Sequence, residues 1–236
     1  MCTLTWSAAV EGGYDLFFNR DERTSRAAEI PPVAGRTETG VEYLAPADGD
    51  HGGTWLLLNT HGLTVCLLNY YPRGIVETGR ESRGRLPLAC ASCMRSEDVP
   101  QALRYLVLTN YAPFHLVAVD GAGSGIQLSW DGQELHEMAA PGFLTSSSFE
   151  SVKIQARRAE VYARRTPAQS GERFHWAHDP SDGAGSVLMC RPDAATRSVC
   201  AIRVRSGEAS LAYSPVRWAD GQLVTPERQL IVLSRA

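Results

Sequence analysis

Hydrophobic and polar residues alternate near the start of the chain in the way that short β-strands require. Residues 3–10 and 14–19 are strand-like, and Glu11-Gly12-Gly13 supplies the positive φ of a hairpin turn between them. The following stretch, 24–50, is rich in Pro, Gly, Glu and Thr and has no sustained period. We therefore predict a β-hairpin at the start of the chain, then a long loop with one short strand near 41–44.

The strand pattern returns after this loop. Residues 53–58 and 63–70 are apolar and are separated by the turn sequence Asn59-Thr60-His61-Gly62, which predicts a second and mostly buried hairpin. Further strands are predicted, in chain order, at residues 114–120, 124–130, 133–138, 186–191, 199–204 and 209–213. Strands therefore dominate both ends of the sequence.

Between these strands, the hydrophobic period changes to that of helices. Apolar residues recur at spacings of three and four from residue 82 to residue 107, which predicts two helices, the second with Ser96 as its N-cap. Another helix with a solvated basic face is predicted at 149–165. This pattern predicts an α+β fold with two antiparallel sheets and helices outside them, in one domain over residues 1–236.

Composition and charge narrow the classes of function. The formal net charge is −3 with both signs interspersed, so we expect neither nucleic acid nor an anionic membrane as a partner. No apolar run approaches the roughly 18 residues of a membrane span, and the N-terminus lacks the pattern of a secretory signal. Six irregularly spaced cysteines do not resemble a disulfide framework. We therefore expect a cytoplasmic protein with free thiols.

Cys2 is the candidate reaction centre. Removal of Met1 would leave one residue with both a thiol nucleophile and a free α-amine that can act as its base. The return strand of the first hairpin ends in Arg20 and Asp21, close to Cys2. We expect Arg20 to lower the pKa of the thiol and to hold a substrate carboxylate, and Asp21 to orient the α-ammonium group. The alternative is that Cys2 is a small hydrophobic residue beside a solvated strand end.

Several motifs resemble one family. The run Met1-Cys2-Thr3, followed by a hairpin and by Asn19-Arg20-Asp21-Glu22, resembles the NRDE family, also called the transport and Golgi organisation protein 2 family. Further matching motifs are Gly52-Gly53-Thr54-Trp55-Leu56, Asn59, Gly62, Leu68-Asn69-Tyr70, Ser82-Arg83-Gly84, Leu144-Thr145-Ser146 and Thr196-Arg197-Ser198. Residues 59–72 are also similar to the choloylglycine hydrolase and penicillin acylase branch of the N-terminal-nucleophile (Ntn) hydrolases.

This resemblance implies an α+β fold of four layers, αββα, of the Ntn hydrolase type. It also implies that Cys2 is the nucleophile, that Arg20 and Asp21 lie beside it, and that Asn69 donates to a tetrahedral oxyanion. A side-chain amide at the end of a buried strand suits this role because it offers an N–H without a charge. The alternative for Asn69 is a satisfied buried amide or a turn-forming residue.

Neighbouring motif positions are further candidates. We assign Asn19, Asn59 and Ser146 to substrate binding on the strength of the resemblance. Ser146 stands where the hydrolase branch has an active-site Asn, so a hydroxyl replaces an amide and turnover is expected to be slow or lost. Arg197 is available near the end of the chain, and we favour a solvent-facing strand entry over a place in the cleft.

Two other clusters are given structural interpretations. Cys90 and Cys93 have the spacing of a redox or zinc motif, but they fall in an apolar helical pattern without a second pair, which favours the core. His175, His178 and Asp179 favour a solvated loop over a metal site, because no third ligand and no supporting residue can be named. We therefore expect no metal.

Two functions remain open on the sequence alone. In the first, Cys2 hydrolyses an amide or thioester of a small acyl compound, and no cofactor is required. In the second, the same scaffold binds or carries haem or an acyl compound, because the family resemblance also implies roles in haem handling and lipid homeostasis. His51, His61 and His115 are then candidate axial ligands of haem iron. A retained Met1 would block the first function by displacing the α-amine from the thiol.

Overall fold

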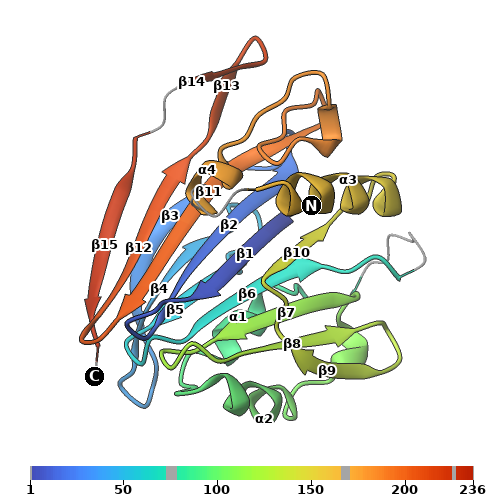
Figure 1. Cartoon of the computed structure of the whole chain (residues 1–236). Helices are drawn as coiled ribbons and strands as arrows, with labels where there is room; N and C mark the ends of the chain where they lie inside the picture. The colour runs from blue at the N-terminus through green and yellow to red at the C-terminus, as the bar shows by residue number, and fades with distance from the viewer. Residues whose placement is uncertain (1, 73–78, 166–170, 225–226, 236) are drawn as a thin grey trace.

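Two large antiparallel sheets form the centre of the computed structural model, which describes residues 2–72, 79–165, 171–224 and 227–235 (Figure 1). The six-stranded sheet contains, in spatial order, β10 (Phe143–Ser146), β1 (Cys2–Ala8), β2 (Tyr14–Arg23), β11 (Ala194–Arg205), β12 (Glu208–Pro215) and β15 (Gln229–Ser234). The seven-stranded sheet contains β3 (Ile30–Arg36), β4 (Glu42–Ala47), β5 (Leu56–Asn59), β6 (Thr64–Asn69), β7 (Phe114–Val119), β8 (Gly125–Trp130) and β9 (Leu135–Ala139). A small ribbon pairs β13 (Arg217–Ala219) with β14 (Gln222–Val224).

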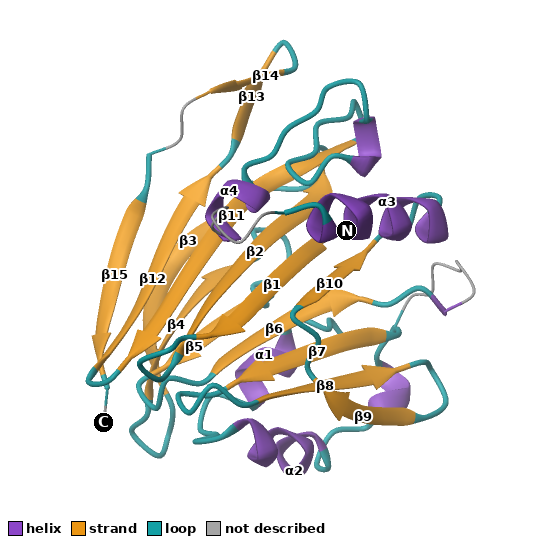
Figure 2. Cartoon of the chain, viewed as in Figure 1, coloured by secondary structure: helices purple, strands orange, loops and turns teal. Residues whose placement is uncertain are grey.

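Short helices lie at the periphery of these sheets (Figure 2). The α-helices are α1 (Arg85–Ala89), α2 (Val99–Leu103), α3 (Ser151–Ala163) and α4 (Gly171–His175), and 3₁₀ turns span Ser96–Asp98, Leu108–Asn110 and Gly183–Gly185. Helices α3 and α4 pack on the six-stranded sheet, whereas α1 packs on β5 and β6 of the seven-stranded sheet. The predicted α+β architecture, two antiparallel sheets with helices outside, is confirmed, although the helical layers are thin.

The main core fills the space between the two sheets. Leu4 and Phe18 of one sheet share a buried cluster with Leu56, Leu68 and Val117 of the other. A second buried cluster covers the outer face of the seven-stranded sheet, where α1 and α2 pack. Because each face of that sheet is covered, its central strands are apolar on both sides, which explains why residues 63–70 are almost continuously hydrophobic.

The first hairpin is confirmed and fixes the start of the chain in the sheet. β1 pairs with β2 so that Cys2 lies opposite Arg20, and it pairs with β10 so that Cys2 also lies opposite Ser146. Gly13 in the turn has φ +80°, and a Cβ there would lie 2.0 Å from the carbonyl oxygen of Val204. Only glycine fits this turn, which holds β1 and β2 in register.

The stretch 24–50 was predicted as a long loop with one short strand near 41–44; that strand is confirmed as β4, but the loop prediction was wrong at β3. This stretch forms the antiparallel pair β3 and β4 at the edge of the seven-stranded sheet. An edge strand tolerates Pro31 and Pro32 because it lacks a partner on one side, and β3 is exposed along most of its length. The sequence of β3 therefore lacks the hydrophobic alternation from which a strand is predicted.

The predicted strand at 186–191 was also wrong. These residues are irregular, and only Cys190 forms an isolated bridge, with Ala195. The strand is β11, which begins at Ala194, earlier than expected, and pairs along β2 with Thr196 opposite Asp21. Residues 194–196 therefore lie in this strand, opposite the end of β2.

The helical stretch at 82–107 is more broken than its period predicts. It holds two five-residue helices, and Ser96 is the first residue of a 3₁₀ turn instead of an N-cap. The Ser96 hydroxyl donates to Asp120 at 2.8 Å, so it joins this segment to the turn after β7. Within the described residues, no helix has both the length and the apolar character needed to cross a membrane.

Candidate functional site

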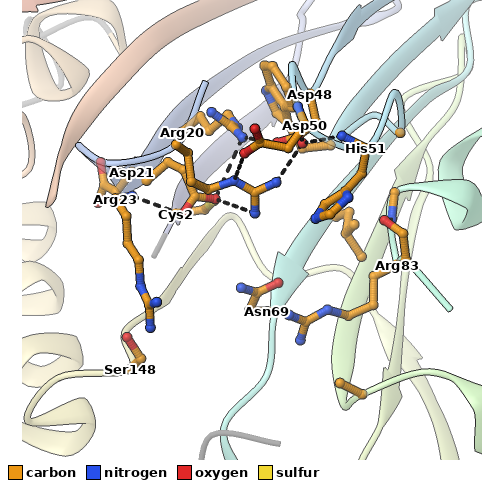
Figure 3. Close-up of a pocket in the computed structure, with 18 of the residues that line it drawn as sticks. Cys2, Arg20, Asp21, Arg23, Asp48, Asp50, His51, Asn69, Arg83 and Ser148 are labelled. Atoms are coloured by element: carbon orange, nitrogen blue, oxygen red, sulfur yellow. Dashed lines mark hydrogen bonds and ion pairs between the residues drawn. The ribbon is translucent and has the colours of Figure 1, made fainter. Parts of the chain in front are cut away.

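A cleft of about 990 Å³ lies where the ends of the two sheets separate (Figure 3). Strands β1 and β2 contribute Cys2, Arg20 and Asp21 to its lining, and we call these three residues the thiol wall. The seven-stranded sheet contributes Asn69 at the end of β6, and Tyr71 and Arg83 follow in the chain; we call these three the amide wall. The cleft therefore brings together the four residues to which the sequence assigned catalysis.

Cys2 stands at the start of β1 and belongs partly to the core between the sheets. Its placement opposite Arg20 confirms the expected approach of the two hairpin ends. Thr145 of the neighbouring strand donates its hydroxyl to the Cys2 carbonyl at 3.0 Å. Pairing on both sides fixes the backbone of Cys2, so a ligand has to approach the thiol from the cleft.

Arg20 is held by carboxylates of the protein. Its guanidinium donates to Glu29 at 2.8 Å and to Asp48 at 2.6 Å, and it stacks over the ring of Trp55 at 4.2 Å from the centroid. Tyr213 donates to the other oxygen of Glu29 at 2.6 Å. The terminal nitrogens of Arg20 are thus engaged, so the structure gives no support to the expectation that Arg20 holds a substrate carboxylate.

Asp21 is fully buried beneath β1 and is paired with Arg158 of α3. Both terminal nitrogens of Arg158 lie 3.0 Å from Asp21 Oδ2, and Thr196 donates to Oδ1 at 2.7 Å. Arg158 also donates to the Thr3 hydroxyl at 2.8 Å. Sequence reasoning missed Arg158 because it placed the basic residues of this helix in solvent. Its spacing of four from the buried Ile154 was the signal that both share one face.

The amide wall has fewer internal bonds. Asn69 Nδ2 donates to the Tyr71 hydroxyl at 3.0 Å, which uses one of its two N–H groups. Arg83 donates through Nη1 to the Pro113 carbonyl at 2.8 Å. In Figure 3 the Arg83 side chain reaches through the cleft toward Asn69. Arg83 had been noted only as part of a motif, and its place in the cleft comes from the structure.

Two glycines place Arg83 in the cleft. Gly84 follows Arg83, and a Cβ on Gly84 would lie 2.8 Å from Cα of Gly53. The backbone N–H of Thr54 donates to the Gly84 carbonyl at 2.9 Å. The two chain segments can approach this closely only because neither residue carries a side chain.

Burial dominates the ionisation of the Cys2 thiol. It raises the pKa of Cys2 above its ordinary value, and the negative charge of Asp21 acts in the same direction. The positive N-terminus, Arg20 and the Asp21 backbone N–H act to lower the pKa of Cys2, but they do not outweigh burial. Arg20 therefore acts to lower the pKa of the thiol, as predicted. The net pKa of Cys2 is nevertheless raised, because burial has the larger effect.

The three residues assigned to substrate binding lie outside the cleft lining. Asn19 donates to the carbonyls of His175 and Val187 on the outer face of β2. Asn59 donates to the carbonyls of Ala91 and Cys93 and accepts from two backbone N–H groups of its own turn. Both side-chain amides are used within the fold, so this geometry indicates that they stabilise turns and layers.

Ser146 lies beside the thiol without lining the cleft. It is 2% exposed and pairs across the strands with Cys2. Its buried hydroxyl has no hydrogen-bond partner among the described residues. Arg197 lies at an irregularity of β11 and is also absent from the lining, in agreement with the preference for a place outside the cleft.

The histidines take different positions from those that a shared metal or haem site would need. His51 lines the cleft, whereas His115 packs on Tyr70 and lies 2.8 Å from the Ser129 hydroxyl. His175 is fully buried at the end of α4 and bonds through both ring nitrogens, to Thr5 and Asn19, so the predicted solvated loop was wrong at this residue. Within the described ranges, no group of three His, Cys, Asp or Glu residues could hold a metal ion.

The cysteine pair after α1 belongs to the core, as expected. Cys90 is buried in the cluster formed by α1, α2 and the sheet, and Cys93 packs at its edge. All six cysteines are free. The Cys90 thiol lies 3.4 Å from the Leu86 carbonyl and also interacts with Cys93.

A family model described as Transport and Golgi organisation 2 matches residues 1–167, which include both walls of the cleft. The chain belongs to the Transport and Golgi organisation 2 family. The family expected from the motifs around Cys2 and Asn69 is thereby confirmed. No curated protein matches the chain.

Solved structures place this member of the Transport and Golgi organisation 2 family on a known scaffold. The C2A variant of conjugated bile acid hydrolase from Clostridium perfringens aligns with a TM-score of 0.57 and 14% identity, over 99% of this chain and 92% of that chain. Penicillin V acylase from Agrobacterium tumefaciens aligns with a TM-score of 0.56 and 12% identity, over 98% and 86% of the two chains.

A third structure extends this similarity to an animal protein. The Caenorhabditis elegans orthologue of N-acylethanolamine-hydrolyzing acid amidase aligns with a TM-score of 0.54 and 10% identity, over 86% of this chain and 92% of that chain. At these identities the likeness concerns the fold alone. It confirms the predicted Ntn-hydrolase-like sandwich.

Proposed function

We propose that this protein is a hydrolase in which Cys2, as the N-terminal residue, attacks the carbonyl carbon of an amide or thioester. The observation that carries the proposal is the position of Cys2 and Asn69 on opposite walls of one cleft (Figure 3). A carbonyl group between them would meet a sulfur nucleophile on one side and an amide donor on the other. The fold shared with amidases and acylases supports the same reaction class.

The proton transfers follow from the chemistry of an N-terminal cysteine. The α-amine of Cys2 accepts the thiol proton as sulfur bonds to the carbonyl carbon, and the oxyanion accepts a hydrogen bond from the second N–H of Asn69. Collapse breaks the C–N or C–S bond, and the ammonium group gives its proton to the departing amine or thiolate. Water then attacks the acyl–sulfur bond, which releases the carboxylic acid and regenerates the thiol.

The raised pKa of the Cys2 thiol is compatible with this sequence of steps. Burial keeps the thiol protonated near neutral pH, so the reaction needs a base beside it. A free α-amine on the same residue is that base, and Asp21 lies close enough to the thiol to act on its charge. We assign Asp21, locked by Arg158, to orient the amine, and Arg20 to position β2 beside Cys2.

The test compares three forms of the protein whose N-termini are verified by intact mass. These are a chain that starts at Cys2, a chain that retains Met1, and a chain in which Cys2→Ser is the first residue. We expect turnover of short-chain acyl amides or thioesters only from the first form, because the second lacks the adjacent amine and the third needs a harder ionisation. Equal turnover by the first two forms would contradict the proposed role of the amine.

A second candidate function is the binding of haem or an acyl compound without turnover. Its specific support is His51, which lines the cleft and carries an imidazole that can ligate iron. The spectrum of added haem in the same three forms distinguishes the functions, because axial ligation by His51 is independent of Met1. Haem spectra that are alike in all forms but lost in His51→Ala, with no turnover in any form, would favour binding.

A further inference from the structure

The charges that line the cleft are not evenly matched. Its carboxylates are those of Asp21, Glu22, Asp48, Asp50, Glu81 and Asp193. Each of them forms an ion pair with an arginine, either within the lining or just outside it. Within the described part of the chain, three arginines of the lining form no such pair: Arg23, Arg80 and Arg83. Among its described lining residues, the cleft therefore offers unpaired cations to a ligand and no unpaired carboxylate.

Arg83 differs from the other two unpaired arginines in its burial. Arg23 and Arg80 are exposed, so water solvates their charge, whereas Arg83 is half-buried. Burial is the main cause that lowers the pKa of Arg83 from its ordinary value. Its only hydrogen bond to a described residue is the one donated by Nη1 to the neutral Pro113 carbonyl. A partly desolvated cation without a carboxylate gains more from an anionic ligand than a solvated one does.

The direction of the Arg83 side chain sets where that anion would sit. Figure 3 shows the guanidinium extending into the cleft beside Asn69. Charge interactions of Arg83 with both Tyr71 and Cys2 indicate that it lies close to the reaction centre. An anion held here would be close to the carbonyl group placed between Cys2 and Asn69.

We propose that Arg83 is a specificity-determining residue that binds a carboxylate or phosphate carried by the acyl substrate close to its scissile bond. This inference rests on the proposed function, because it assigns the substrate class of the same site. The planar guanidinium fork matches two oxygens of either anion, and no described residue accepts a hydrogen bond from Nη2 or Nε of Arg83. Arg20 cannot replace it, because its terminal nitrogens are held by Glu29 and Asp48.

The experiment uses two pairs of substrates with the same acyl chain. The carboxylate pair is an N-acylglycine and its neutral N-acylglycinamide, and the phosphate pair is an N-acyl phosphoethanolamine and its neutral N-acylethanolamine, so each anion lies only a few bonds from the amide nitrogen. For the chain that starts at Cys2, we expect kcat/KM of the anionic member to exceed that of the neutral member by about 10–100-fold in at least one pair. The pair that shows the larger ratio identifies the anion.

Three variants connect this ratio to Arg83. Arg83→Gln should reduce the ratio to near one, and Arg83→Lys should give an intermediate value because a point charge remains while the fork is lost. Arg104→Gln is the matched control, since it removes an exposed arginine outside the cleft lining and should leave the ratio unchanged. If Arg83→Gln lowers kcat/KM of both members equally, the residue supports the fold alone and the inference is overturned.

A binding measurement keeps the inference separate from the proposed function. Titration calorimetry with Cys2→Ala and the same substrates measures affinity without turnover. Tighter binding of the anionic member to Cys2→Ala, lost when Arg83→Gln is added, supports the anion site. If that result is found and no substrate is hydrolysed by the chain that starts at Cys2, only the hydrolase proposal fails. Equal affinity for the anionic and neutral members of both pairs, or equal turnover of them, overturns the anion site.

Discussion

The two walls of the cleft are built on different principles. In the thiol wall, Arg20 and Asp21 are buried and each is bonded to at least two side chains of other elements. In the amide wall, Asn69, Tyr71 and Arg83 are half-buried, and few bonds connect them to the protein. The difference teaches that the charged residues at the end of β2 mainly hold Cys2 in place. The groups still able to bind a ligand lie mostly on the opposite sheet.

The largest effect is expected from breaking the buried pair behind the thiol wall. Arg158→Met would leave Asp21 buried without its cation, so the free energy of unfolding should fall by about 3–5 kcal/mol. Urea denaturation followed by circular dichroism measures this change. Arg157→Met on the same helix is the control, because its pair with Asp182 is partly exposed and should contribute much less to stability. Equal losses in the two variants would show that the thiol wall is not locked as described.

The second effect concerns the amide wall and appears in activity instead of stability. Asn69→Ala in the chain that starts at Cys2 should lower kcat by about 10²–10³-fold, because it removes the proposed oxyanion donor. Urea denaturation should show little change, since the side-chain amide of Asn69 bonds only to the Tyr71 hydroxyl among described residues.

Asn59→Ala provides the matched contrast for that experiment. The Asn59 amide holds four backbone groups outside the cleft, so its loss should destabilise the fold by about 1–3 kcal/mol with a smaller effect on kcat of the folded enzyme. If Asn69→Ala and Asn59→Ala change stability equally and change kcat equally, Asn69 has no catalytic role.

A pH-dependent effect of about 2–3 kcal/mol between pH 6 and pH 4 is expected behind the thiol wall. Burial, reinforced by the charges of Arg165 and Arg158, lowers the pKa of His175 from 6.5 to about 3. The unfolded chain therefore takes up a proton below pH 6.5 that the folded chain refuses. This contribution to stability is present above pH 6.5 and is lost as the pH falls toward 3, by about 1.4 kcal/mol per pH unit.

Substitution of the histidine checks this slope. His175→Gln should flatten the fall in unfolding free energy between pH 6 and pH 4, as followed by urea denaturation. His136→Gln is the control because His136 is exposed, and it should leave the slope as in the unaltered protein. A slope that His175→Gln does not change would mean that His175 is charged in the folded state.

The smallest expected effect is a difference in alkylation rate among the thiols. The hydrogen bond from Cys90 lowers the pKa of Cys93, whereas burial raises that of Cys2 and, more strongly, that of Cys66. In the chain that retains Met1, iodoacetamide at pH 7 should therefore modify Cys93 several-fold faster than Cys2, with Cys66 last. Peptide mass spectrometry measures the rates. Modification of Cys2 first would mean that the thiol wall activates its nucleophile despite burial.

Local pattern predicted the parts of the fold that depend on neighbouring residues. The hairpin of β1 and β2 was expected because alternation and glycine turn chemistry act within about twenty residues. Strand β3 was missed because its pairing with β4 is decided at an exposed sheet edge, where no hydrophobic alternation is required. The early start of β11 at Ala194 depends on the distant end of β2, which a local pattern cannot register.

The same limit applies to the candidate site. Cys2, Arg20, Asp21 and Asn69 could be assigned from motifs, because chemistry and chain position agree there. The partners that decide what Arg20 and Asp21 can do come from far along the chain, and one of them, Arg158, looked like a solvated residue of α3. Conversely, Asn19 and Asn59 carry suitable chemistry but point into the protein, which only the packing reveals.

Because β1 is paired from its first residue, the fold does not depend on whether Met1 is removed. Cys2 is already bonded into the sheet on both sides, opposite Arg20 and Ser146, so the sheet needs no rearrangement when Met1 is absent. Trimmed and untrimmed molecules would then share one melting curve and one elution volume while differing in chemistry. The specific activity of a sample would then be proportional to its trimmed fraction. To obtain kcat, the rate should be divided by the concentration of active centres from a covalent titration, and not by the concentration of folded protein.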